Sequence, residues 1–336
     1  MSKLEDLPKS RLVTCIKRAL KNRYLRILPV PPTQKDIKDL LRIYIHQSSD
    51  KPVVYRSSGY FHQPLMLLHI LEMNHNDCHI KRSSDLAKMD YQLFATKETR
   101  RYPSADGYVY VKDPILIPLA KKEIILAEYE SCKRKGKMLV IPMTIRYGGG
   151  LHSNMLIFNF HRNELERFEP HGKKTGGVDA GISYSIDIEC FKLAKYMRLR
   201  YISSENIFSQ AHLGKGFQAF DTAPLEEHIR DDYVIKDPRG FCTAWSFFYA
   251  DIRLKYPQYS AIVLTDQIYS GIGKNPGMLR KFIRGQMKFL EKEVNKINGF
   301  CSYTYFINLD TKSEEYKDTK KLYQTYINKR FSELAK

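Results

Sequence analysis

The most constraining feature of the sequence is a set of three strand-length apolar segments between Lys137 and Gly172. They read KMLVIPMTIRY, HSNMLIFNFH and NELERFEPHG, and three glycines at positions 148 to 150 separate the first two. Apolar runs of this length, bounded by turn residues, are typical of strands joined as hairpins. The sequence therefore predicts an antiparallel sheet in this part of the chain.

Helical spacing of apolar residues follows the predicted sheet. We expect a helix over Ile188–Met197, a strand over Leu199–Ile202, and a helix over Cys242–Tyr256 that ends before Pro257. The last of these has apolar residues at i, i+3, i+4 and i+7, namely Trp245, Phe248, Tyr249 and Ile252. The sequence thus predicts an α+β fold, with a mixed sheet and the Cys242 helix packed across it.

The N-terminal part of the chain has a different pattern, which favours helices. Three are predicted, at Leu12–Leu28, Gln34–His46 and Gln63–Met73, and the first of them is strongly basic. Residues Asn74–Arg101 are polar with short apolar inserts, which is typical of a connecting or peripheral region. We therefore expect a mainly helical N-terminal region at residues 1–135.

The remaining chain is predicted to form two further units. Residues 136–300 hold the expected α+β domain, which closes with a basic helix at Gly277–Ile297, and residues 301–336 form a strand and helix extension. Within that extension, Asp310–Lys320 reads as loose and Lys321–Leu334 as helical.

Charge and cysteine usage bound the surroundings of the chain. Its 336 residues hold 55 Lys and Arg against 37 Asp and Glu, a net charge of +18. A polyanionic neighbour and a merely solvated basic surface both account for this charge. The six cysteines are scattered singly, as expected of free thiols in a reducing compartment. We expect neither a secretory signal nor a membrane helix, since no apolar stretch approaches ~18 residues.

Cys242 has the position of a catalytic nucleophile. Only the thiolate of a cysteine is nucleophilic, and the unpaired amides at the start of a helix favour the anion. Gly240 permits a sharp entry into the helix, and the amide of Cys242 would face an oxyanion formed at its sulfur. The other interpretation of such a cysteine is a small packing residue.

His152 and Glu169 supply the base and the acid that a thiol nucleophile requires. His152 opens the second predicted strand, and a turn at His161–Asn163 would bring Glu169 within about two residues of the position opposite His152. A carboxylate there can hold the imidazole tautomer and stabilise the imidazolium. Two alternatives stay open: His171 as the base, and Asn154, on the face of His152, as the orienting group.

These residues resemble a known family, the adenain and Ulp1-like clan of cysteine peptidases, whose triads run in the order His, then acid, then Cys. The resemblance rests on LHSNMLIFNF, ERFEPHG and GFCTAWSFFYADIRLKYP, covers about Met138 to Tyr256, and is nearest to divergent members from large cytoplasmic DNA viruses. It implies an adenain-like or papain-like peptidase core, with His152 as general base, Glu169 as orienting acid and Cys242 as nucleophile. It also implies the host cytoplasm or the virion as the location.

The sequence departs from the clan in the approach to the cysteine. Members usually carry a Gln a few residues before the Cys to help form the oxyanion hole, whereas this chain has Lys236 and Asp237 in YVIKDPRGFC. Gln218, in GFQAF, is a candidate for that role from the far side of a long loop, and Asp237 is another polar group near the cysteine.

The function that the sequence predicts is a thiol protease or isopeptidase without cofactor or metal. The resemblance implies a protein substrate, either a ubiquitin-like modifier conjugate or a viral precursor. Two alternatives remain: a basic nucleic-acid-binding or packaging protein without catalysis, and an acetyltransferase of the same clan that uses Cys, His and Glu. The three histidines and Cys78 within His69–His79 lack the paired spacing of a zinc site.

Overall fold

The computed structural model describes the chain between Gly59 and Leu334, with gaps. The described residues are 59–74, 94–104, 107–116, 122–147, 150–172, 180–208, 214–221, 242–272, 289–297, 299, 309–310 and 312–334. The predicted helices at Leu12–Leu28 and Gln34–His46, and most of the one at Gly277–Ile297, lie outside these residues.

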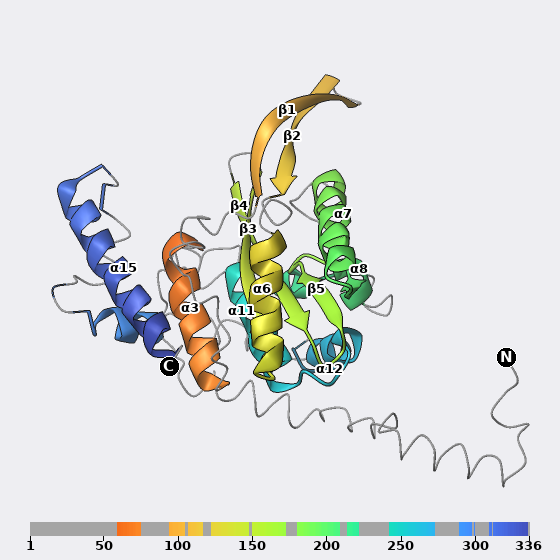
Figure 1. Ribbon diagram of the computed structural model, residues 1–336. Coiled ribbons are helices and arrows are strands. Elements are labelled where there is room, and N and C mark those ends of the chain that lie inside the picture. Colours follow the sequence, from red (N-terminus) through yellow and green to blue (C-terminus); the bar gives the residue numbers. More distant parts are fainter. Residues whose placement is uncertain are drawn as a thin grey trace, which may run out of the picture.

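A mixed sheet of six strands forms the centre of the described fold (Figure 1). Its order is β2-β1-β3-β4-β5-β6, with β1 parallel to β3, β5 parallel to β6, and the other neighbours antiparallel. The strands are β1 (Phe94–Ser104), β2 (Gly107–Leu116), β3 (Leu139–Tyr147), β4 (Gly150–Asn159), β5 (Glu164–Phe168) and β6 (Arg200–Ile202).

The helices flank this sheet and were partly predicted from the sequence. They are α3 (Gly59–Met73), α6 (Lys122–Arg134), α7 (Ala180–Tyr196), α8 (Ser204–Ile207), α11 (Cys242–Lys255), α12 (Ala261–Ile272) and α15 (Glu314–Leu334), with a short 3₁₀ helix, η3 (Phe217–Asp221). Helix α11 ends two residues before Pro257, as expected, because proline lacks the amide that would continue it.

The side chains of β3 and β4 alternate between two apolar cores on opposite faces of the sheet. Met155 and Ile157 pack on one face with α3, α11, α12 and α15. Leu156 and Phe158 pack on the other face with α6 and α7. Both faces of the strands are buried because helices cover each of them, which explains why the apolar segments are nearly continuous in the sequence.

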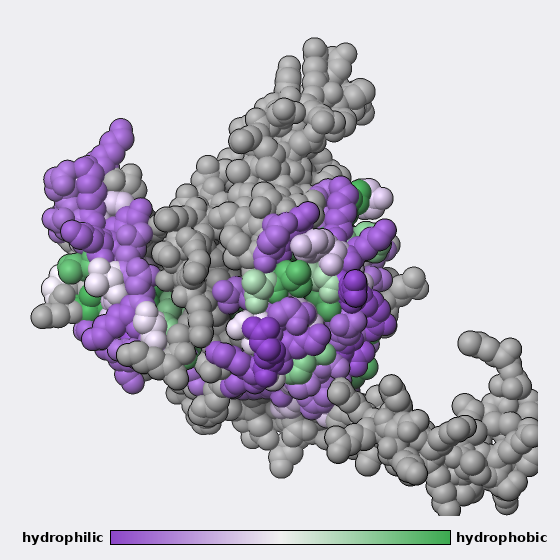
Figure 2. All heavy atoms as spheres, viewed as in Figure 1, coloured by the Kyte–Doolittle hydropathy of each residue, from purple (hydrophilic) through white to green (hydrophobic). Residues whose placement is uncertain are grey.

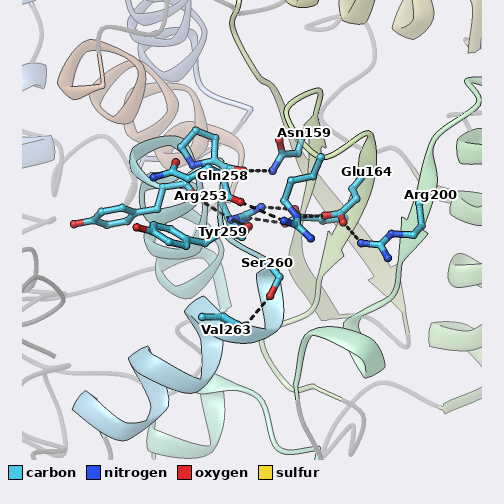
Figure 3. A network of polar contacts seen from close by, with 12 residues as sticks. Asn159, Glu164, Arg200, Arg253, Gln258, Tyr259, Ser260 and Val263 are labelled. Atoms are coloured by element: carbon cyan, nitrogen blue, oxygen red, sulfur yellow. Dashed lines mark hydrogen bonds and ion pairs between the residues drawn. The ribbon is translucent and has the colours of Figure 1, made fainter. Parts of the chain in front are cut away.

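A buried ion pair fastens β5 to α11. The Arg253 guanidinium donates two hydrogen bonds to the Glu166 carboxylate, at 2.8 and 2.6 Å, and the Tyr249 hydroxyl donates a third at 3.0 Å. Arg253 also donates to the carbonyl oxygens of Tyr256 and Tyr259, which fixes the turn after α11 (Figure 3). This network fixes α11 against the sheet at a set height and rotation.

The predicted α+β class is confirmed, and the structure differs from the sequence-based expectation in several places, of which the following three are the largest. Residues 94–116 form a hairpin, although the N-terminal region was expected to be mainly helical. Helix α15 begins at Glu314, where a loose segment was expected, since Ser313 accepts a hydrogen bond from the amide of Tyr316 and so caps it. Cys132 is disulfide-bonded, so the prediction that all cysteines are free thiols is wrong.

The division into three domains stays a prediction. Helices α3 and α15, from outside residues 136–300, share one apolar core with α11.

Hydrophilic residues dominate the outer surface of α15 (Figure 2). None of the described helices is long and apolar enough to cross a membrane.

Candidate active site

Cys242 is the first residue of α11 and is 6% exposed. Two hydroxyl contacts hold this end of the helix on β4: Thr243 and Ser153 share a hydrogen bond of 2.9 Å, and Ser246 donates to the Ser153 carbonyl oxygen at 3.2 Å. The thiol therefore lies at the end of the helix where unpaired amides favour an anion, beside the strand that carries His152.

The His152 side chain hydrogen-bonds to the Cys242 thiol and to Glu169. Its Nε2–H donates to Glu169 Oε1 at 2.5 Å, and the imidazole is 3% exposed. Burial alone would lower the pKa of His152, but the Glu169 carboxylate and the contacts with Cys242 outweigh it and raise that pKa to about 10. The imidazolium form is therefore favoured at neutral pH.

The register of the β4–β5 hairpin explains how Glu169 reaches His152. Met155 pairs with Phe168, and the turn occupies residues 160–163, so continuing the register sets Glu169 opposite Asn154. Glu169 thus lies two residues from the position opposite His152, as the sequence predicted.

Four donors surround the buried Glu169 carboxylate. Oε1 accepts hydrogen bonds from His152 Nε2 and from the His171 amide at 3.0 Å. Oε2 accepts one from Asn154 Nδ2 at 2.8 Å and one from Arg167 at 3.5 Å. Burial would raise the pKa of Glu169, but the charge of His152, and then Arg167 and the His171 amide, lower it to about 2. The carboxylate is ionised at neutral pH.

Arg167 and α7 form a second layer behind Glu169. Arg167 Nε donates to Asn154 Oδ1 at 2.9 Å, and its Nη1 lies 3.0 Å from Asp187 Oδ1 and 3.1 Å from the Ser183 carbonyl oxygen. Arg167 is completely buried. Sequence reasoning missed Arg167, Ser183 and Asp187, since an arginine in a strand is usually solvent-exposed.

The two alternatives to this triad have other contacts. The His171 ring stacks on the His152 ring with centroids 4.8 Å apart, and burial, together with the charge of His152, lowers the pKa of His171. Asn154 bonds Glu169 and Arg167. His171 and Asn154 therefore surround the His152–Glu169 pair, and both are in contact with Glu169.

The backbone of Gln218 lies against Pro170, the residue that follows Glu169. The backbone amide of Gln218 donates a hydrogen bond of 2.9 Å to the Pro170 carbonyl oxygen. The backbone amide of Gly216 donates one of 2.9 Å to the His171 carbonyl oxygen. A Cβ on Gly216 would collide with the Pro170 carbonyl oxygen, so this close approach requires glycine. The side-chain Oε1 of Gln218 is buried with no hydrogen-bond partner among the described groups. The approach to the cysteine, including Lys236, Asp237 and Gly240, lies outside the described residues.

The arrangement joins a thiol, an imidazole and an ionised carboxylate in one buried line. Such a set can form a thiolate–imidazolium pair, which is the reactive state of thiol hydrolases. No group of three or more metal-ligating side chains occurs in the described part of the chain. From the predicted His69–His79 cluster, His69 packs on Phe289, and His75, Cys78 and His79 lie outside that part.

Comparison with known proteins gives one informative similarity. The sequence matches no protein-family model and no solved structure. It is 29% identical over 201 residues to a protein of Acanthamoeba polyphaga mimivirus that bears the name of an ankyrin repeat protein. The matching stretch is 55% of this chain and 24% of the relative, so the chain spans about a quarter of that protein's length.

Proposed function

We propose that the chain is a cysteine peptidase or isopeptidase whose nucleophile is Cys242, and that its α+β fold is a divergent adenain-like core. The observation that carries this proposal is the His152 side chain, which hydrogen-bonds to the Cys242 thiol on one side and to Glu169 on the other. In thiol hydrolases the base lies in contact with the nucleophile on one side and with the orienting acid on the other, as His152 does here.

In the proposed reaction, the Cys242 thiolate attacks the carbonyl carbon of a peptide or isopeptide bond. The amide of Cys242 stabilises the resulting oxyanion, and Gln218 is the candidate for a second donor. His152 gives its proton to the leaving amine, and the carbon–nitrogen bond breaks to leave a thioester. Neutral His152 then takes a proton from water, which attacks the thioester and releases the acid and the thiol. Glu169 holds the imidazole ring in place throughout.

The proposed substrate class follows from the chemistry of the triad and from the resemblance to adenain and Ulp1-like peptidases. We propose a protein substrate, either a ubiquitin-like modifier conjugate or a viral precursor. The similarity to a mimivirus protein supports a viral setting, and hence the virion or the host cytoplasm as the place of action. The ankyrin repeats in that relative's name are a property of the relative. The described part of this chain is built on a six-stranded sheet.

Covalent capture tests the proposal directly. Ubiquitin and SUMO probes with a C-terminal electrophile are incubated with the wild type, Cys242→Ala and His152→Ala. Capture that requires Cys242 and is slowed by removal of His152 supports the peptidase and identifies its modifier. Gln218→Ala is expected to slow capture by about 10²- to 10³-fold if Gln218 is the oxyanion donor.

The alternatives predict different outcomes. Acyl transfer predicts an acyl-enzyme formed at Cys242 from acetyl-CoA. A binding protein without catalysis predicts an unreactive Cys242 and nucleic-acid binding that weakens steeply with salt, as expected for a +18 chain. A reactive Cys242 without capture by either modifier favours a viral precursor as the substrate.

A further inference from the structure

The buried cluster behind Cys242 contains more ionisable groups than a triad needs. His152, Arg167 and Glu169 are each at most 3% exposed, and the Asp187 side chain is 24% exposed. Two carboxylates and one guanidinium leave one uncompensated negative charge. Because an unbalanced buried charge is costly, the cluster favours one more positive group. The histidine that lies against Glu169 is the group that can supply it.

Arg167 is shared unequally between the two carboxylates. Its Nη1 lies 3.0 Å from Asp187 Oδ1, whereas its Nη2 lies 3.5 Å from Glu169 Oε2. The shorter contact is with the residue that the proposed reaction does not use. Arg167 is therefore drawn toward α7, and Glu169 is only partly neutralised by it. His152, at 2.5 Å, is the closer cationic partner of Glu169.

We propose that Asp187 is a positioning residue that acts through Arg167: by holding the guanidinium on α7, it leaves the Glu169 carboxylate to keep His152 as the imidazolium. This inference rests on the proposed function, because only an enzyme with a Cys242–His152 pair needs the imidazolium. It assigns to α7 a part in the chemistry although α7 does not touch the thiol.

Three of the four other titratable groups that contact this cluster among the described residues are neutral near neutral pH. The groups that face it from the packed elements are Cys242 of α11, His171 after β5, Tyr201 of β6 and Cys190 of α7. Burial raises the pKa of Tyr201 and that of Cys190, so both are neutral. Burial lowers the pKa of His171, so its ring is neutral as well. Cys242 is the group whose ionisation the test reads out.

Asp187→Asn tests the proposal with little change of shape. Asp187 Oδ1 accepts hydrogen bonds from both Arg167 and Tyr201, and an asparagine oxygen in the same place can accept both. The substitution then removes only the charge. Arg167 would be free to neutralise Glu169, and the His152 imidazolium would lose its proton at a lower pH.

The readout is the pH profile of Cys242 alkylation by iodoacetate, followed by peptide mass spectrometry. An anionic reagent reacts fastest with a thiolate beside an imidazolium, so the rate rises as the thiolate forms and falls as the imidazolium deprotonates. In Asp187→Asn we expect the falling limb to move about 0.5 to 1 pH unit toward acid. Asp251→Asn is the matched control, because it removes a buried carboxylate that pairs with Lys255 on the same helix as Cys242, and it should leave that limb in place.

Each outcome has a distinct meaning. A bell-shaped wild-type profile with an unmoved limb in Asp187→Asn, even with a lower amplitude, would overturn the role of Asp187 and leave the proposed function standing. A wild-type profile without a bell would contradict the proposed function, and the role of Asp187 would fall with it. If Asp187→Asn does not fold, Asp187→Ser removes the same charge and must show the same acid shift.

Discussion

Two of the buried glutamates on β5 and at the residue after it, Glu166 and Glu169, differ in the cation that each one meets. Glu166 faces α11 and is held by Arg253, a permanent cation, with two hydrogen bonds and a third from Tyr249. Glu169 is held by His152, a cation that can lose its proton and that also contacts a thiol. Both carboxylates are fully buried, and both oxygens of each accept hydrogen bonds. The first arrangement can only fasten the helix, whereas the second can take part in proton transfer.

This difference separates stability from chemistry within a distance of three residues. The Glu166 network locates α11, and with it the start of the helix where Cys242 lies. The Glu169 network sets the protonation state of the group that serves Cys242. Substitutions in the first network should therefore change the free energy of unfolding, and substitutions in the second should change thiol reactivity.

The largest effect is expected from His152→Gln. Glutamine can still donate to Glu169 but cannot exchange a proton with the thiol, so we expect the capture rate to fall by about 10³-fold or more. The matched control is His171→Gln. His171 contacts Glu169 through its backbone amide, which survives the substitution, so the loss should stay below about tenfold. Equal losses in the two variants would contradict the assignment of His152.

Arg253→Met should have the largest effect on stability. It leaves Glu166 as an unpaired buried charge, which costs about 3 to 5 kcal/mol in the free energy of unfolding measured by chemical denaturation. Capture per folded molecule should change little. Adding Glu166→Leu to Arg253→Met should recover much of the stability, because both charges are then gone. No recovery in the double variant would mean that shape, and not charge, sets the cost.

Glu169→Gln should slow capture by about 10²- to 10³-fold while the fold persists. The amide keeps hydrogen-bonding capacity but removes the charge that stabilises the His152 imidazolium. Glu166→Gln is the counterpart in the other network, and it should destabilise the protein without changing the pH at which Cys242 reacts. A capture rate as low in Glu166→Gln as in Glu169→Gln, corrected for the folded fraction, would break the comparison.

The smallest of these effects is the pH dependence of stability. His152 stabilises the fold because its pKa is raised from about 6.5 in the unfolded chain to about 10 in the folded protein. This contribution to the free energy of unfolding is fully present below about pH 6.5 and is lost as the pH rises toward about 10. Glu169 stabilises the fold because its pKa is lowered from about 4.5 in the unfolded chain to about 2 in the folded protein. This contribution to the free energy of unfolding is present above about pH 4.5 and is lost as the pH falls toward about 2. Between pH 6 and 9, the difference in the free energy of unfolding between wild type and His152→Gln should shrink by about 1 to 3 kcal/mol.

The Arg253 pair supplies the control for that measurement. The arginine stays protonated over this range, so the stability difference between wild type and Arg253→Met should be nearly constant from pH 6 to 9. A difference that shrinks equally for both pairs would mean that the pH dependence arises elsewhere in the chain.

The sequence predicted the parts of this site that follow from local pattern. Strand-length apolar runs bounded by turn residues located β3, β4 and β5, and the turn length between β4 and β5 set the register that brings Glu169 near His152. Helical spacing located the start of α11 at Cys242. Each of these depends on residues close together along the chain.

The parts that the sequence did not predict depend on contacts between distant segments. Arg167 reads as an exposed position of a strand until α7 covers it and Asp187 pairs with it. The β1–β2 hairpin was missed because its charged residues and two prolines lack the pattern of a buried strand. Gln218 was a candidate by residue type alone, and its place behind Pro170 follows from a glycine contact that no local pattern reveals.

The most direct test of the central claim is the rate at which iodoacetamide alkylates each free cysteine of the chain at pH 6, measured by peptide mass spectrometry in wild type and in His152→Ala. The thiolate–imidazolium pair predicts that Cys242 reacts about tenfold faster than any other free cysteine of the chain, and that this advantage disappears in His152→Ala. If Cys242 reacts no faster than the other free thiols, and its rate does not change when His152 is removed, the residues do not form a catalytic pair.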